Sequence, residues 1–156
     1  MSAASLLLLV GCATASFQVT RPFDAPVQRL SLSFEPLTPT TMTAEQSSRL
    51  RTTLTSSLVE SGISVVPAGE PEVPAVTGTI ELYDPGNRPL RYFVGFGAGR
   101  GSFRSVWRVT SSAGAEAGEC RVDGSIAAGG FGGSYDEVLE KVGEELRNCL
   151  MGAPPP

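Results

Sequence analysis

The chain has 156 residues, of which 41% are hydrophobic and 18% charged, so it carries enough apolar material for one domain with its own core. Its formal net charge of −4 counts against a nucleic-acid-binding protein, because such proteins need a basic surface. The sequence contains no histidine, the commonest general base and zinc ligand, so we expect a protein that is not an enzyme and uses no metal or cofactor.

The N-terminus is a short apolar run, Leu6 to Val10, followed by Gly11 and Cys12. This run is too short to span a bilayer and is typical of a secretory signal peptide. Leu9-Val10-Gly11-Cys12 resembles the lipobox of bacterial lipoproteins, although the usual basic residues before the apolar run are missing. The resemblance implies cleavage before Cys12 and fatty acylation, for example with palmitate, of the new N-terminal cysteine. The alternative is a buried N-terminal strand with an incidental cysteine.

Domain boundaries follow from the segment after this cysteine. Residues 14–26 are rich in Ser, Thr and Pro with little periodicity, which favours a tether between the lipid and the folded domain. We therefore predict a signal peptide at 1–11, a tether at 12–26, a single domain at 27–152 and a disordered tail at 153–156.

The first half of the domain shows strand and helix signals in turn. Alternating apolar residues predict a strand over residues 30–34. A capping box at Thr43-Ala44-Glu45-Gln46 begins a helix with leucines at i+4 spacing, and Gly62 ends it. A short run at 63–66 and a strand at 76–83 follow, and the latter ends at the turn sequence Asp84-Pro85-Gly86-Asn87.

A glycine-rich stretch comes next, with four glycines at alternate positions: Gly95, Gly97, Gly99 and Gly101. In an extended chain they would share one bare face, which could admit a partner's backbone or a ligand. The alternative is a bend or hairpin between two strands. Arg100 and Arg104 could supply anion contacts at the rim, or Arg104 and Arg108 could instead pair with acidic residues of the next strand.

The second half of the domain continues with a turn at Ser111-Ser112-Ala113-Gly114, a strand over 118–127 and a second glycine cluster at 129–133. A second capping box at Ser134-Tyr135-Asp136-Glu137 begins a helix that should stop near Gly152. Cys120 and Cys149 fall on core-facing positions of these two elements. They are expected to form either a disulfide or two buried free thiols.

The order of these elements indicates an α+β domain, a two-layer sandwich in which a mostly antiparallel sheet of about five strands carries two helices on one face. Neither glycine cluster has the spacing of a dinucleotide fingerprint, and no phosphate-loop lysine follows. We therefore expect no nucleotide and no nucleic acid as a ligand.

Two stretches, Gly86-Asn87-Arg88 and the string RYFVGFGAG at residues 91–99, resemble an uncharacterised family of bacterial lipoproteins, the domain of unknown function 4410. The resemblance extends from about Val76 to Leu150. It implies a place in the bacterial cell envelope and brings no catalytic residues.

The sequence is consistent with two functions. The first is a periplasm-facing lipoprotein that binds or positions an unidentified envelope protein, polymer or lipid headgroup without catalysis. Its lipid anchor is expected in the outer membrane, because no aspartate follows Cys12. The second is a structural envelope lipoprotein that self-assembles through its glycine-rich strand. A hydrolase that uses Asp and Glu is disfavoured, because no paired-carboxylate pattern is present.

Overall fold

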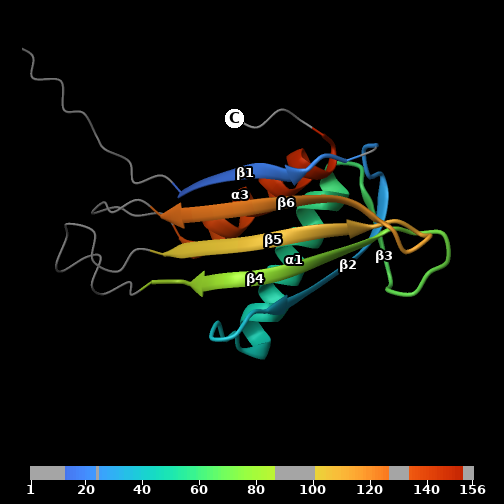
Figure 1. Cartoon of the computed structure of the whole chain (residues 1–156). Helices are drawn as coiled ribbons and strands as arrows, with labels where there is room; N and C mark the ends of the chain where they lie inside the picture. Colours follow the sequence, from blue (N-terminus) through green and yellow to red (C-terminus); the bar gives the residue numbers. More distant parts are fainter. Residues whose placement is uncertain (1–12, 24, 87–100, 127–133, 153–156) are drawn as a thin grey trace, which may run out of the picture.

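The structure, a computed structural model, describes residues 13–23, 25–86, 101–126 and 134–152. These residues form one six-stranded sheet with two helices on one of its faces (Figure 1). The elements in chain order are β1 (Ala13–Arg21), β2 (Arg29–Pro36), α1 (Ala44–Glu60), β3 (Ser64–Val66), β4 (Ala75–Asp84), β5 (Ser102–Thr110), β6 (Glu116–Ile126) and α3 (Tyr135–Leu150). The predicted α+β class with both helices on one face is confirmed.

The strands follow the spatial order β1-β6-β5-β4-β2-β3. The pairings β1–β6, β6–β5 and β5–β4 are antiparallel, whereas β2 runs parallel to both β4 and β3. The parallel pairings arise because α1 connects β2 to β3 as a crossover, which returns the chain in the same direction. The sheet therefore has one strand more than predicted. Its β4-β2-β3 part is parallel, whereas the rest is antiparallel.

The N-terminal strand β1 corrects the predicted tether. Residues 12–26 were expected to form a linker, but Ala13–Arg21 pairs with β6 in a register that sets Ala13 opposite Ile126. Ala15, Phe17 and Val19 turn toward the core, while the intervening Ser, Thr and Gln side chains are exposed. This period of two is present in the sequence, but small and hydroxyl-bearing residues make it weak.

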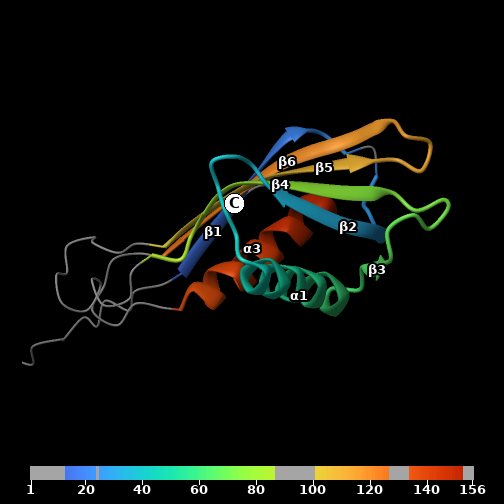
Figure 2. The ribbon, with the colours of Figure 1, turned by 90° about the horizontal axis from the view of Figure 1, so that it is seen from below.

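The two helices lie side by side across the same face of the sheet (Figure 2). The predicted capping box of α1 is present, since Thr43 Oγ1 accepts from the Gln46 amide at 3.2 Å and Gln46 Oε1 accepts from the Thr43 amide at 2.8 Å. Ser134 caps α3 by accepting from the Glu137 amide at 3.2 Å. The leucine stripe of α1 is fully buried against the sheet: Leu50, Leu54 and Leu58.

The centre of the core is Trp107 on β5, which is completely buried. Its indole Nε1 donates to Ser105 Oγ at 2.8 Å, and Ser105 Oγ donates to the Val122 carbonyl at 3.2 Å. The ring lies over Gly78 of β4, where an added Cβ would come within 2.6 Å of Trp107 Cη2. The indole N–H of Trp107 and the hydroxyl of Ser105 are thus both hydrogen-bonded. Burying these two polar groups therefore carries little desolvation penalty.

Candidate functional site

Several chain segments converge at one end of the sheet. β1 begins there at Ala13, opposite Ile126 at the end of β6, and β4 ends at Asp84 opposite Ser102 at the start of β5. α3 starts close by, because Tyr135 Oη donates to the Ser102 carbonyl at 3.2 Å. We call this end of the sheet the proximal end (Figure 1). It is formed by residues 13, 84–86, 101–102, 125–126 and 134–135.

Gly101 is the predicted partner-binding glycine that the structure describes. It is buried, and its carbonyl accepts from the Ile126 amide at 3.0 Å. A Cβ at this position would lie 3.0 Å from Tyr135 Cδ2, 3.1 Å from Ile126 Cδ1 and 3.3 Å from the Asp84 carbonyl oxygen. Gly101 therefore permits close packing of the proximal end, and its inward-facing side is not available to a partner. Gly95, Gly97, Gly99, Arg100 and Cys12 lie outside the described residues.

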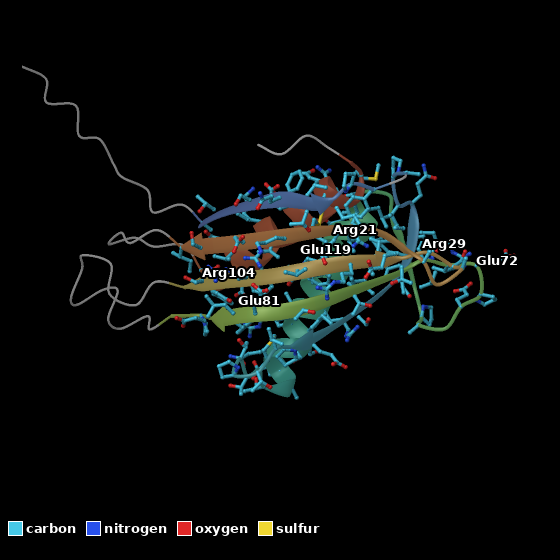
Figure 3. The ribbon with its side chains drawn as sticks, in the orientation of Figure 1. Arg21, Arg29, Glu72, Glu81, Arg104 and Glu119 are labelled. Carbon is cyan, nitrogen blue, oxygen red and sulfur yellow. A yellow bond between two sulfur atoms is a disulfide. The ribbon has the colours of Figure 1, made fainter. Side chains whose placement is uncertain are left out.

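Arg104, the other described candidate, lies on the sheet face opposite the helices (Figure 3). Its Nε donates to Asp123 Oδ1 at 2.9 Å, and Arg108 Nε donates to Glu119 Oε2 at 2.7 Å. The predicted cross-strand pairing of these arginines is thus confirmed. The same face carries four cross-strand ion pairs in all: Arg21–Glu116, Arg104–Asp123, Arg108–Glu119 and Arg121–Glu81.

Glu119 on this face accepts hydrogen bonds from two side chains. The hydroxyl of Thr20 on β1 donates to Glu119 Oε1 at 2.7 Å, and this hydrogen bond, with help from Arg108, lowers the pKa of the Glu119 carboxyl. The charged side chains of β5 and β6 are each paired with an opposite charge. The face is a polar, solvated surface and presents no concentrated charge of one sign.

A pocket of about 480 Å³ opens at the proximal end between the starts of α1 and α3 and the end of β4. Arg49 bridges the two helices there, since its guanidinium donates to Asp136 Oδ1 at 3.1 Å and to Glu45 Oε1 at 3.3 Å. The rings of Tyr83 and Tyr135 form the apolar side, edge to face with centroids 5.1 Å apart. Burial raises the pKa of both tyrosines, so their hydroxyls remain protonated.

We call this pocket the proximal pocket. The sequence did not predict it. Its residues come from three elements that are far apart along the chain, and each has an ordinary local role. Glu45 and Asp136 occupy first helical turns, where acidic residues complement the helix dipole. The weak signal available was a tyrosine at the end of a strand and another at the start of a helix.

Cys120 on β6 and Cys149 on α3 are joined by a disulfide, with their Cα atoms 6.6 Å apart. Of the two alternatives drawn from the sequence, the structure contains the bridge. Both residues are fully buried. The bridge links the C-terminal turn of α3 to the middle of β6, the strand next to β1.

Within the described ranges, no helix has both the length and the apolar character needed to cross a bilayer. In the same part of the chain, no three His, Cys, Asp or Glu side chains gather in a way that could hold a metal ion. The proximal pocket offers a ligand charge-assisted hydrogen bonds and aromatic faces.

Comparison with solved structures places this architecture among known folds. Two structures of PelC dodecamers from Paraburkholderia phytofirmans, one a single-substitution variant, each share 12% identity and a TM-score of 0.58 with this chain. The alignments cover 91% and 92% of this chain and 98% and 99% of those chains. Protein XCC0632 from Xanthomonas campestris, of the DUF330 family, has 11% identity and a TM-score of 0.54, covering 85% of this chain and 87% of its own. At these identities the likeness is one of fold alone.

Among curated proteins, none is similar enough in sequence to match this chain. A family model matches residues 24–130, more than half of the chain, and its family is described as Domain of unknown function (DUF4410). The match begins earlier and ends earlier than the stretch from Val76 to Leu150 expected from the sequence. The chain belongs to the family described as Domain of unknown function (DUF4410).

Proposed function

We propose that the protein is a non-enzymatic lipoprotein, anchored in the outer membrane through Cys12 and facing the periplasm, that binds or positions a partner in the cell envelope. The observation that carries the proposal is the position of β1. Ala13 follows Cys12 directly and is already paired with Ile126 in the sheet. An acylated Cys12 would therefore hold the proximal end against the bilayer, because adjacent Cα atoms are only about 3.8 Å apart.

The anchor would be firm and its orientation restricted. Each buried CH₂ of an acyl chain contributes about 0.8 kcal/mol, so several chains make release slow. With no spacer between lipid and sheet, the domain stands on its proximal end. The open sheet face and the distal end, which includes the β5–β6 turn at residues 111–115, remain accessible from the periplasm.

The sequence of the connecting segments supports a membrane-facing proximal end. Residues 87–100 and 127–133, which begin and end at this edge, contain three of the chain's twelve basic residues and none of its sixteen acidic residues. They also contain four aromatic residues: Tyr92, Phe93, Phe96 and Phe131. Arginine and aromatic side chains are favoured at lipid headgroups.

The disulfide also supports an envelope location, because such bridges persist in oxidising compartments and are rare in the cytosol.

The test is Cys12→Ser with intact-mass analysis and membrane fractionation of the full chain. The variant should lose the acyl mass and leave the outer-membrane fraction, whereas a matched Cys120→Ala, Cys149→Ala variant should keep both. Wild-type mass and outer-membrane recovery of Cys12→Ser would contradict the proposal.

A second candidate function, self-assembly, is favoured by the outer edge of β1. Among the described strands this edge is unpaired, and residues 13–20 contain neither proline nor a charged residue. Natural proteins usually protect such edges, as the opposite edge does with the three-residue β3 followed by Pro67. The PelC structures that share the fold are dodecamers.

Membrane anchoring restricts how copies could associate. Antiparallel β1–β1 pairing would direct the two Cys12 residues to opposite ends of the pair, so an upright assembly must instead be cyclic about the membrane normal. Light scattering of the full-length Cys12→Ser chain after size exclusion distinguishes the two functions. A single monomeric species across the accessible concentration range would rule out self-assembly through the protein alone.

A further inference from the structure

The described residues that line the proximal pocket include one positive and two negative side chains beside two aromatic rings. Arg49 is about half exposed and makes hydrogen bonds to both Glu45 and Asp136. The exposed fraction of the Glu45 side chain is 82%, against 49% for Asp136. The contact with Glu45 is therefore the more readily exchanged, since a solvated ion pair between flexible side chains contributes little.

The charge balance of the pocket restricts its ligand. Among the described lining residues, the Arg49 guanidinium stands between two carboxylates, so a simple anion that takes its donors also comes close to negative charge. A simple cation would have to compete with Arg49 for the same carboxylates. A compact zwitterion avoids both conflicts, because its anionic group can take the guanidinium donors from Glu45 while its cationic group faces Asp136.

The two tyrosines favour the same ligand. Tyr83 is partly buried, and its ring lies edge to face with that of Tyr135. A tyrosine face attracts an ammonium group through its quadrupole. The volume of about 480 Å³ lies within the range usual for small-molecule pockets and would hold a headgroup without its acyl chains.

We infer that the proximal pocket binds phosphoethanolamine, with the phosphate on Arg49 and the ammonium group between Asp136 and the Tyr83 ring. The source of the ligand, a phosphatidylethanolamine headgroup, rests on the proposed function, because only a membrane-facing proximal end brings the pocket to the bilayer surface. The binding chemistry itself does not depend on the anchor.

The experiment titrates soluble glycerophosphoethanolamine, in which one phosphodiester charge balances one ammonium charge, into the detergent-purified full chain by calorimetry. Arg49→Gln and Asp136→Asn should each weaken binding by about tenfold or more, the loss of one charge-assisted hydrogen bond. Arg104→Gln is the matched control, since it also removes an arginine paired with an aspartate, but on the outer sheet face, and it should leave affinity unchanged. Circular dichroism of each variant verifies that it is folded.

Ethanolamine and inorganic phosphate, tested separately, should each bind about tenfold more weakly than glycerophosphoethanolamine or not at all. Equal binding of inorganic phosphate alone, unchanged affinity in both pocket variants, or no binding by the wild type would overturn the inference.

A second arm uses the full-length Cys12→Ser chain with phosphatidylcholine vesicles that contain or lack phosphatidylethanolamine. Recruitment that requires phosphatidylethanolamine and Arg49 assigns the ligand to lipid. Binding of the soluble probe without recruitment overturns the lipid source. Failure of the probe in a chain that is nevertheless acylated at Cys12 overturns the pocket and leaves the proposed function standing.

Discussion

Removing the disulfide by Cys120→Ala with Cys149→Ala should destabilise the domain substantially. The two cysteines are 29 positions apart in sequence, and the bridge links the middle of β6 to the end of α3. In the chain-entropy model, closing such a loop removes about 12 cal/mol/K from the unfolded state, or about 3.6 kcal/mol at 25 °C. A domain with a typical unfolding free energy of about 5–15 kcal/mol would lose a large part of its stability.

The assay is equilibrium urea unfolding of three samples: the oxidised wild type, the wild type in reductant, and the double variant. In a parallel thermal melt, each kcal/mol corresponds to about 3–5 °C in Tm for a domain of this size, so a loss of about 3.6 kcal/mol should lower Tm by roughly 11–18 °C. The reduced wild type should resemble the double variant, apart from a small contribution of the two buried sulfur atoms. A loss below about 1 kcal/mol, or two reactive thiols in the unfolded, unreduced protein, would refute the reasoning.

Two further predictions concern packing and charge. Gly78→Ala should destabilise by about 1–3 kcal/mol, because its Cβ has no room beside Trp107, and a thermal midpoint equal to the wild type would contradict this packing. Thr20→Val should raise the pKa of Glu119 toward its ordinary value of 4.5 and lower stability at pH 7 by less than about 1 kcal/mol. Because the pKa of Glu119 is lower in the folded than in the unfolded protein, this group stabilises the folded state above the unfolded-state pKa, and the contribution is lost as pH falls through the folded-state pKa. An NMR titration in which Thr20→Val leaves the pKa of Glu119 unchanged would refute the assignment.

The elements with strong local signals were predictable from the sequence. The capping box at Thr43 begins α1, and Gly62 and Gly152 adopt positive φ just after the helices, where left-handed backbone ends a helix. The alternation of arginines along β5 predicted their partners on β6, because antiparallel strands place facing side chains directly opposite one another.

The features that the sequence did not reveal depend on tertiary context. β1 has alanine at two of its four inward positions, so its amphipathic pattern is faint, and its pairing with β6 crosses almost the whole chain. The parallel pairing of β2 and β4 depends on the α1 crossover. The proximal pocket needs three elements to meet, and no local pattern records that Arg49 reaches Asp136.

The orientation of the domain on the membrane tests the central claim most directly. Nitroxide labels at Asp84→Cys, at the proximal end, and Ala113→Cys, in the distal turn, can be placed on exposed positions of the anchored protein. β5 has nine residues between these ends, which corresponds to roughly 25–30 Å. Power-saturation measurements should find the Asp84→Cys label at the headgroups and the Ala113→Cys label at least about 20 Å farther into the aqueous phase. Equal depths, or the reverse order, would contradict a domain held by Cys12 with its proximal end against the bilayer.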